Sequence, residues 1–454
     1  MRRLIFIIVT GISIALFTVY LPEYAFSVDI FLLGLFIGGL CVYLSSKEDA
    51  KFLLTIFMTG YLLRIVLSLI LHLFAAQFAY RETSFAFEGF FIGDGLSYWS
   101  NGVVLKDLWN IGIFPDKATF HKYYADCPTV SAYDYINGFI MTMAMGVTPV
   151  NLFFLNSLLG ALSIIVIYLI TAKLTDKNIA RWAALLYCFW PSLVLWSTQN
   201  LKEPGYIFFV YLVIFSLMML IKKFSIWYLL CIILSTYIAF ILRPPIAISI
   251  VMLLGVFFLL FLSNRRNKFV SIFFGIIVLI GAFWFLWQKR GSLLPNELWF
   301  DYSSFDPDIF LERVNLARKV RTFGGSSFLP GLDFSNFGQL LLFLPVGAAV
   351  VFLLPFPWQI GSAMQFMTAP ETFIWYILIP FIFKGFVYCF KKNRGYTIIV
   401  AGYVLIMALI LGVTEGNIGT LFRHKSIIIG LCLIFAATGI HLKIESNSKA
   451  KLII

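Results

Sequence analysis

The chain has 454 residues, of which 61% are hydrophobic and only 12% are charged, and its mean hydropathy is +0.93. Soluble globular proteins carry about twice this charged share, so the composition excludes that class and identifies a polytopic membrane protein. The formal net charge is +12, but the basic residues form short clusters between apolar segments. Such clusters are typical of the loops that set the orientation of a membrane protein. We therefore expect membrane lipids as partners and no nucleic acid.

The apolar segments predict the transmembrane helices in chain order. A bilayer-crossing helix needs about 20 mostly apolar residues. Such segments lie near 4–21, 28–46, 52–79, 149–172, 178–196, 205–222, 226–242, 246–263, 269–288, 371–390, 396–413 and 426–443. The first resembles a signal peptide but lacks a small-residue cleavage site, so we interpret it as a retained helix. The predicted fold class is all-α and polytopic, with about 12 transmembrane helices.

The basic clusters predict the orientation of these spans. With both termini cytoplasmic, the basic clusters of every short loop lie inside, as the positive-inside rule requires. Two apolar pieces, 134–147 and 339–356, are then left over, and we interpret them as juxtamembrane or re-entrant helices on the outer face. Two long outer loops, about 80–148 and about 289–370, follow from this arrangement. We therefore expect any chemistry at the outer face of the cytoplasmic membrane.

The first outer loop contains an acid in "GDGLSYWSNG", Asp94. Helical periodicity after it places Leu96 and Trp99 on one face and Tyr98 on the face of Asp94, which predicts a helix lying in the membrane interface. An aspartate at the N-cap stabilises a helix by about 1 kcal/mol. Capping and a catalytic role are both open interpretations of Asp94, and they are compatible.

A second acid, Glu88, lies six residues before Asp94. Two carboxylates suit acid–base exchange or the binding of a divalent cation, although this spacing is not a metal motif of its own. The alternative is that Glu88 is a solvated acid of the loop.

The short hairpin between the expected fifth and sixth spans contains Lys202 and Glu203. These charges could pair with each other and with lipid headgroups. Alternatively, Lys202 binds a phosphate group and Glu203 orients that phosphate or a sugar hydroxyl. The sequence leaves both interpretations open.

Two further outer turns contain cations. Arg243 lies in "FILRPPIAIS", and Arg423 and His424 lie in "TEGNIGTLFRHKSIII". A single cation there could simply extend to headgroups. Because a guanidinium group binds phosphate in a bidentate manner, we expect at least one of these residues to bind an anionic head together with Lys202.

Motifs for several other chemistries are missing from the sequence. It has no P-loop, no G-x-S-x-G, no H-E-x-x-H and no cysteine cluster, and its four histidines are scattered. We therefore predict no metal site. The second outer loop contains "FLERVNLARKVRTFGG", an amphipathic basic helix expected on the outer leaflet, with acceptor binding as the alternative.

The order of these features resembles the N-terminal half of the GT-C glycosyltransferases, in particular the bacterial branch related to protein O-mannosyltransferases and lipid A aminoarabinose transferases. The acid of "GDGLSYWSNG" is followed by the interfacial "YDYINGFIMTMAMGV", by a span with the small-residue patch "LLGAL", and by "FWPSLVLWSTQNLKEP". The resemblance covers about residues 52 to 222. It makes residues 1–50 an extra N-terminal helical pair and residues 51–454 the GT-C-like domain.

The resemblance implies that a hexose moves from a polyprenyl-phosphate-linked donor to a glycan, lipid or protein acceptor. Asp94 would be the general base, and Lys202, Arg243 and Arg423 would hold the donor phosphate. The substrate-binding residues would be Glu88, Tyr98, Lys202, Glu203, Arg243, Arg423 and His424. Many relatives have adjacent acids where this chain has Asp94 alone, so a divalent metal is left as an alternative that no motif supports.

Two other functions compete with this one. A polysaccharide polymerase or ligase of the O-antigen type also has about twelve spans, but its large loop usually comes late in the chain, whereas here the loop with the acid comes early. A flippase or transporter of lipid-linked sugars would show ionisable groups near the middle of the bilayer. The polar residues gather at outer turns instead, so we rank transport last.

Overall fold

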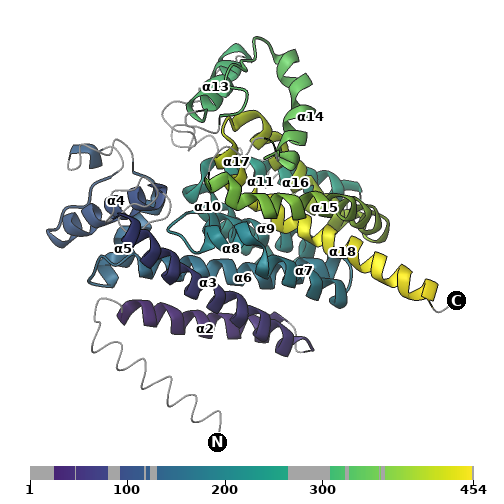
Figure 1. The fold of residues 1–454 in the computed structure, drawn as a ribbon, viewed down its shortest axis with the longest axis horizontal. Coiled ribbons are helices and arrows are strands. Elements are labelled where there is room, and N and C mark those ends of the chain that lie inside the picture. Colours follow the sequence, from purple (N-terminus) through teal and green to yellow (C-terminus); the bar gives the residue numbers. More distant parts are fainter. Residues whose placement is uncertain are drawn as a thin grey trace, which may run out of the picture. The chain divides into compact units, whose positions relative to one another are not determined.

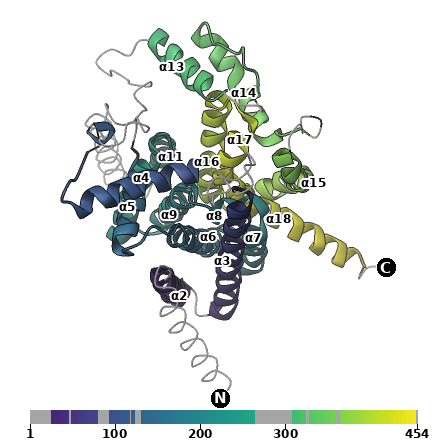
Figure 2. The ribbon, with the colours of Figure 1, turned by 60° about the vertical axis from the view of Figure 1, so that its left-hand side comes forward.

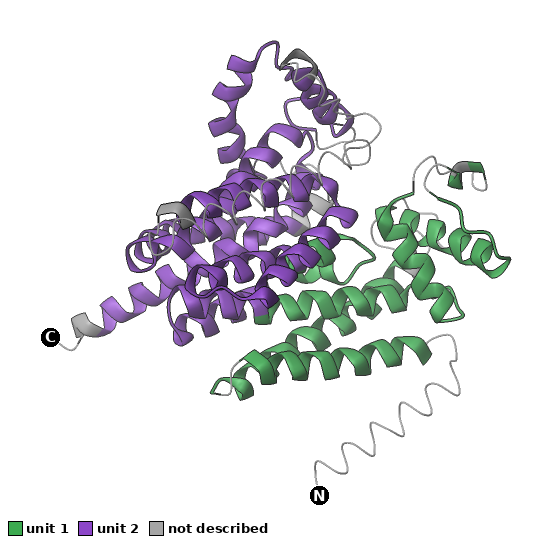
Figure 3. Ribbon diagram, turned by 180° about the vertical axis from the view of Figure 1, so that it is seen from behind, with its two compact units in different colours: residues 1–165, 193–208 green, residues 166–192, 209–454 purple. Residues whose placement is uncertain are grey.

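The computed structural model describes residues 25–45, 48–79, 93–116, 119–122, 130–263, 307–322, 327–356, 358 and 363–451. The secondary structure there is helical apart from one isolated bridge between Ser327 and Asn417 (Figures 1 and 2). The expected spans near 4–21 and 269–288, and Glu88, lie outside the described residues. The chain divides into two compact units (Figure 3): residues 1–165 with 193–208, and residues 166–192 with 209–454.

Unit 1 consists of two helical pairs and parts of three further helices. It contains α2 (Ala25–Ser45), α3 (Ala50–Ala79), α4 (Gly93–Asn110), the 3-10 turn Phe120–Lys122 and α5 (Ala132–Met143), with parts of α6 (Val150–Leu174), α8 (Pro191–Ser197) and α9 (Glu203–Lys222). Helix α2 packs on α3, and α4 packs on α5.

Unit 2 is built around the C-terminal helices. It contains the rest of α6 and α9, α7 (Lys177–Phe189), α10 (Ile226–Leu242), α11 (Pro244–Ser263), α13 (Pro307–Val320), α14 (Phe337–Leu353), α15 (Ala363–Lys392), α16 (Arg394–Thr414), α17 (Ile418–His424) and α18 (Ser426–Lys451). Helices α15 and α18 pack closely, because a Cβ atom on Gly385 or Gly439 would collide with a backbone carbonyl of the other helix. Small residues allow the same close approach between helices in membranes generally.

The described helices confirm a multi-pass membrane protein but not the count of twelve. Seven of them are long and apolar enough to cross a bilayer, and the bent pair of α7 and α8 would make eight. Helix α10 and the stretch Pro244–Leu260 of α11 are apolar but shorter. Of the two leftover apolar pieces, one forms α5, with 12 residues, and the other forms α14, with 17. Both are shorter than the roughly 20 residues that a span needs, and their predicted place at the outer face stays a prediction.

Candidate functional site

The packing of α4 against α5 depends on two glycines. A Cβ atom on Gly102 would lie 2.7 Å from Cβ of Asn137, and one on Gly138 would lie 2.9 Å from Cβ of Leu105. Real Cβ atoms do not approach so closely, so each helix contributes a glycine where the other passes. The contact brings polar side chains of α4 within hydrogen-bonding reach of α5.

A buried amide, Asn200, connects this helix pair to the turn before α9. Its Nδ2 donates to the carbonyl of Gly95 at 3.0 Å and to Oδ1 of Asn137 at 2.8 Å. Its Oδ1 accepts from the hydroxyl of Tyr133 at 3.0 Å. Asn156 of α6 extends the network, because its Nδ2 donates to the carbonyl of Leu201 at 2.8 Å. The first turn of α4 and the chain just before Lys202 are thereby held in one arrangement.

Asp134, on α5, is a structural acid of the same network. It accepts hydrogen bonds from Nδ2 of Asn101 at 3.1 Å and from the backbone N–H of Ser131 at 2.5 Å, so it caps its own helix. Burial raises the pKa of this carboxyl, the hydrogen bonds from Ser131 and Asn101 oppose the rise, and the charge of Lys202 opposes it as well. Lys202 therefore belongs to the electrostatic surroundings of Asp134.

The structure brings Asp94, Tyr98 and Lys202 to one region of unit 1. Asp94 is exposed in the first turn of α4, and Tyr98 follows one turn later. Nζ of Lys202 lies 5.5 Å from the ring centroid of Tyr98, within the range of a cation–π contact. The ring of Tyr133 meets that of Tyr98 edge-on, with centroids 5.1 Å apart. The ammonium group of Lys202 thus contacts an aromatic ring that lies one helical turn after an exposed carboxylate.

Two details of α4 differ from the sequence prediction. The helix begins at Gly93, so Asp94 lies within the first turn rather than at the N-cap, where its charge still favours the positive end of the helix. The buried face of α4 is formed by Gly95, Asn101, Gly102 and Leu105, whereas the predicted apolar residues Leu96 and Trp99 are only partly buried. The difference arises because α4 packs through glycine and amide groups on α5.

Glu203 lies beside Lys202 at the start of α9, and only 1% of its surface is exposed. Its negative charge contributes to raising the pKa of Tyr133, after burial. A carboxylate in the first turn also interacts favourably with the helix dipole. The predicted role of Glu203 in orienting a substrate stays a prediction.

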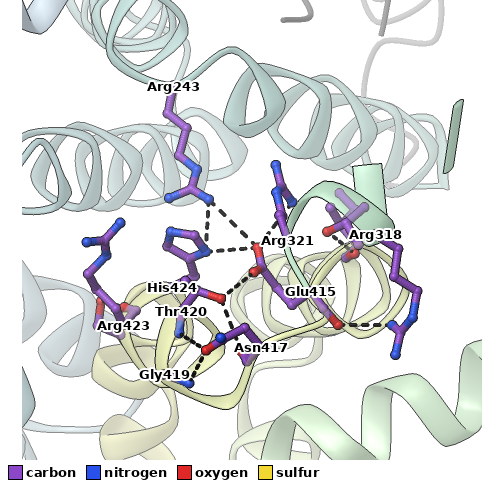
Figure 4. Close-up of polar contacts among 12 residues, drawn as sticks. Arg243, Arg318, Arg321, Glu415, Asn417, Gly419, Thr420, Arg423 and His424 are labelled. Carbon is purple, nitrogen blue, oxygen red and sulfur yellow. Dashed lines mark hydrogen bonds and ion pairs between the residues drawn. The ribbon is translucent and has the colours of Figure 1, made fainter. Parts of the chain in front are cut away.

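Unit 2 contains a cluster of cations around one acid, Glu415, which follows the last residue of α16 (Figure 4). Its Oε1 lies 2.8 Å from Nδ1 of His424, 3.1 Å from Nη1 of Arg321 and 3.9 Å from Nη2 of Arg243. Its Oε2 accepts from the hydroxyl of Thr420 at 3.1 Å. Arg243 also contacts Nδ1 of His424, at 3.0 Å. We call these five residues the Glu415 cluster.

The electrostatics of the Glu415 cluster favour an anion. The neighbouring His424, Arg321 and Arg243 hold the pKa of Glu415 well below its usual range, although burial acts in the opposite direction. Burial and the charge of Arg243 lower the pKa of His424 to about 4, so this imidazole is neutral near pH 7. Two guanidinium groups then face a single carboxylate, which leaves an excess of positive charge. Burial lowers the pKa of Arg321; the charge of Glu415 opposes this, and the charge of Arg243 adds to it.

Arg318 holds helix α13 on the cluster. It is 1% exposed, and its Nη1 donates to the backbone carbonyl of Glu415 at 2.9 Å, while its Nη2 donates to the carbonyl of Phe328 at 3.1 Å. The backbone N–H of Phe328 donates to the carbonyl of Gly416 at 2.7 Å. Arg321 lies in the turn directly after α13, and its backbone N–H donates to the carbonyl of Arg318 at 3.0 Å, so the anchored Arg318 also holds the turn that carries Arg321.

The predicted site residues thus fall into two groups. Asp94, Tyr98, Lys202 and Glu203 belong to unit 1, and Arg243, Arg423 and His424 belong to unit 2. Arg423 is half-buried on α17, and its charge contributes to the low pKa of His424. Among the described residues, no three His, Cys, Asp or Glu side chains gather as metal ligands would.

Arg318, Arg321 and Glu415 are not among the site residues predicted from the sequence, although the segment with the two arginines has acceptor binding as an alternative role. The first two lie in the segment interpreted as a surface helix, where their spacing of three residues was a usable signal. Glu415 was an acid placed directly after a span and eight residues before two cations. That spacing alone does not reveal that the chain folds back through α17. The contact between Glu415 and the residues of α17 is therefore seen only in the structure.

Comparison with known proteins identifies a family for part of the chain. Residues 131–287 match the family described as dolichyl-phosphate-mannose-protein mannosyltransferase. No significant match was found among the curated proteins. Among solved structures, the crystal structure of the oligosaccharyltransferase of Archaeoglobus fulgidus in the apo form is similar, with 14% identity and a TM-score of 0.38. The alignment covers 84% of this chain and 56% of that chain, so the present chain spans little more than half the length of that protein.

The matched segment contains α5, Lys202, Glu203 and Arg243. It overlaps the region in which the order of sequence features resembles the GT-C glycosyltransferases. The family match over residues 131–287 therefore confirms that resemblance, to a family of GT-C membrane glycosyltransferases.

Proposed function

We propose that this protein transfers a sugar from a polyprenyl-phosphate-linked donor to a hydroxyl group of a glycan, lipid or protein acceptor. The reaction takes place at the outer face of the cytoplasmic membrane, with both termini of the chain in the cytoplasm. The observation that carries the proposal is the Glu415 cluster, where guanidinium groups in excess over carboxylates gather beyond the ends of the spans. The family match over residues 131–287 supports glycosyl transfer as the chemistry.

The Glu415 cluster is assigned to the donor phosphate. Arg243 and Arg321 both lie near Oε1 of Glu415, and two positive charges against one carboxylate leave an attraction for a phosphate oxygen. During transfer, the bond between the anomeric carbon and the phosphate oxygen breaks, and negative charge develops on the leaving polyprenyl phosphate. Fixed cations stabilise this charge better than water does, because they need no reorganisation at that moment.

The exposed carboxylate of Asp94 is assigned to the acceptor. Asp94 takes the proton of the acceptor hydroxyl as that oxygen forms its bond to the anomeric carbon. The Asn200 network holds the first turn of α4 and the residue before Lys202 in one arrangement, so the carboxylate is presented from a rigid helix. Lys202 and the ring of Tyr98, which contact each other, are assigned to the polar and the apolar faces of the bound substrate.

The deciding experiment follows a labelled sugar. Purified full-length protein in lipid nanodiscs receives a polyprenyl-phosphate-linked hexose together with acceptor fractions from a bacterial envelope. We expect a covalent sugar–acceptor product and release of polyprenyl phosphate in equal amounts. In sealed vesicles, labelled lipid-linked sugar that crosses the bilayer without any covalent product would support the flippase instead. Products that grow by whole oligosaccharide blocks would support the polymerase.

A further inference from the structure

The ring nitrogen Nδ1 of His424 is shared by two neighbours in the Glu415 cluster (Figure 4). Nη2 of Arg243 lies 3.0 Å from Nδ1, and Oε1 of Glu415 lies 2.8 Å from it. The two neighbouring atoms are 3.9 Å apart, so they approach the nitrogen from different directions. A neutral imidazole nitrogen has one position in the ring plane, which holds either a proton or a lone pair. Nδ1 therefore makes one good hydrogen bond at a time.

The two neighbours make opposite demands on that position. A guanidinium group only donates, so Arg243 needs a lone pair on Nδ1. An ionised carboxylate only accepts, so Glu415 needs a proton there. The imidazole is neutral near pH 7, because burial and the charge of Arg243 lower the pKa of His424 to about 4. The tautomer of this neutral ring thus decides whether Arg243 or Glu415 is the partner of Nδ1.

The other contacts of Glu415 indicate which partner Nδ1 has when no phosphate is bound. Oε1 of Glu415 also accepts from Nη1 of Arg321 at 3.1 Å, and its Oε2 accepts from the hydroxyl of Thr420 at 3.1 Å. The carboxylate is therefore bound without His424. Nη2 of Arg243 lies 3.9 Å from that carboxylate, which is beyond hydrogen-bonding distance. We therefore expect Nδ1 to accept from Arg243 in this state.

A bound phosphate would reverse this preference. The exposed fraction of the side chain is 26% for Arg321 and 11% for Arg243, but 1% for Glu415, so a ligand meets the guanidinium groups first. A phosphate oxygen attracts a guanidinium group more strongly than a neutral imidazole does, because the bond joins opposite charges. Once Arg243 donates to the phosphate, a lone pair on Nδ1 faces the oxygen of Glu415, and two acceptors repel each other. The ring proton then favours Nδ1, where it bonds to the carboxylate.

We propose that His424 is a tautomeric switch, which holds Arg243 ready for the donor phosphate and releases it when the phosphate binds. The proposal rests on the proposed function, because it takes the Glu415 cluster as the phosphate site. On binding, a proton leaves Nε2 and another arrives at Nδ1, so the net charge of the ring does not change. His424 is therefore a positioning residue, because it acts on the phosphate through Arg243 rather than by contact.

The test is nitrogen NMR of full-length protein that is isotope-labelled at histidine and held in nanodiscs of zwitterionic lipid near neutral pH. The chain has four histidines, so the ring signals are few, and those of His424 are assigned by their loss in His424→Gln. The ring shifts distinguish a protonated nitrogen from one with a lone pair. The probe is a short-chain polyprenyl phosphate. The polyprenol of the same length, which lacks the phosphate, is the ligand control.

We expect Nδ1 of His424 to carry a lone pair without ligand and a proton with the polyprenyl phosphate, whereas the polyprenol should change neither state. Arg243→Met removes the donor, so Nδ1 should carry the proton even without ligand, and affinity for the phosphate should fall about tenfold. Arg394→Met is the matched control, because Arg394 is an exposed arginine at the opposite end of α16 from Glu415. This control should behave like the wild type.

The outcomes separate the switch from the proposed function. Binding of the polyprenyl phosphate without a change at His424 would overturn the switch and leave the donor assignment intact. A lone pair that stays on Nδ1 in Arg243→Met would also overturn the switch, because Arg243 would then not hold the tautomer. If the wild-type protein binds no polyprenyl phosphate, the proposed donor is wrong, and the switch fails with it. Should Arg243→Met not fold, the wild-type comparison with and without the phosphate decides alone.

Discussion

Arg318 and Glu415 are joined through the backbone rather than through their charges: Nη1 of Arg318 donates to the main-chain carbonyl of Glu415 at 2.9 Å. The carboxylate of Glu415 therefore contacts Arg321, Arg243 and His424 instead. The end of α13 and the turn after it thus supply two arginines with different tasks. Arg318 fixes the loop, and Arg321 completes the cation cluster.

Replacing Arg318 should detach α13 from the end of α16. In Arg318→Met, the carbonyls of Glu415 and Phe328 lose their donor in a buried place, which should cost about 2–4 kcal/mol of stability. Hydrogen exchange in nanodiscs should rise over residues 307–322, and the thermal midpoint should fall. Lys319→Met is the matched control, because Lys319 is exposed on the same helix. Equal exchange in the two variants would show that Arg318 does not anchor α13.

Replacing Arg321 should weaken donor binding without detaching the helix. Arg321→Met removes one guanidinium from Oε1 of Glu415, but Arg243 and His424 still accompany that carboxylate. We expect the KM for the polyprenyl-phosphate sugar to rise about tenfold, since a charge-assisted phosphate contact contributes roughly 1.5–3 kcal/mol. Exchange over 307–322 should stay at the wild-type level. An unchanged KM would exclude Arg321 from the phosphate site.

The sequence predicts the membrane helices of this fold well, for a physical reason. Burying about 20 apolar residues in lipid is a local requirement, so segments such as 149–172 and 396–413 are visible in the sequence and form α6 and α16. Which face of a helix is buried is harder to predict from the sequence, because it depends on the helix that packs against it. Helix α4 buries Asn101 and Gly102 beside Leu105, whereas Leu96 and Trp99 are only partly buried, and the packing on α5 explains that choice.

The sequence predicts those residues of the candidate site that are unusual on their own, as polar groups beside apolar segments. Arg243 and His424 are polar groups at the ends of apolar segments, and such groups are expensive near a membrane. Glu415 and Arg321 are 94 residues apart and belong to segments with no shared pattern. Their contact depends on how the segment with Arg321 folds back on the end of α16, which hydropathy does not encode.

The Glu415 cluster should make stability depend on pH below neutrality. The pKa of His424 is about 4 in the folded chain and 6.5 when unperturbed. The unfolded chain therefore binds a proton that the folded chain does not, and stability is lost as pH falls from about 6.5 toward 4. Between pH 5 and 6.5 the unfolded Glu415 carboxyl, with a pKa of 4.5, is still ionised, so this slope belongs to His424.

The measurement is the thermal midpoint at pH 7.5 and at pH 5.2. The wild-type midpoint should fall over this interval, and in His424→Gln the fall should be smaller. The control is His441→Gln, which changes a histidine near the C-terminal end of α18 and should keep the wild-type slope. An equal fall in all three proteins would assign the pH dependence elsewhere.

Replacing Asn200 should loosen the region around Asp94. In Asn200→Ala, the carbonyl of Gly95, the amide of Asn137 and the hydroxyl of Tyr133 each lose a buried partner. We expect a loss of about 2–4 kcal/mol and faster hydrogen exchange in α4 and α5.

Asn110→Ala provides the comparison for Asn200→Ala, because Asn110 is exposed at the end of α4. Turnover should fall with Asn200→Ala even at saturating donor, since the acid is then held less rigidly. Unchanged exchange and turnover would mean that other contacts suffice to hold α4.

Removing the charge of Asp94 tests the chemical step itself. Asp94→Asn keeps the size of the side chain but cannot accept the acceptor proton, so kcat should fall by about a hundred- to ten-thousandfold. The KM for the donor should stay near its wild-type value, because the Glu415 cluster is intact. Asp107→Asn is the matched control, since Asp107 is an exposed acid on the same helix, with 65% of its side chain accessible. Full turnover by Asp94→Asn would remove Asp94 as the base and leave it as a residue of the first helical turn.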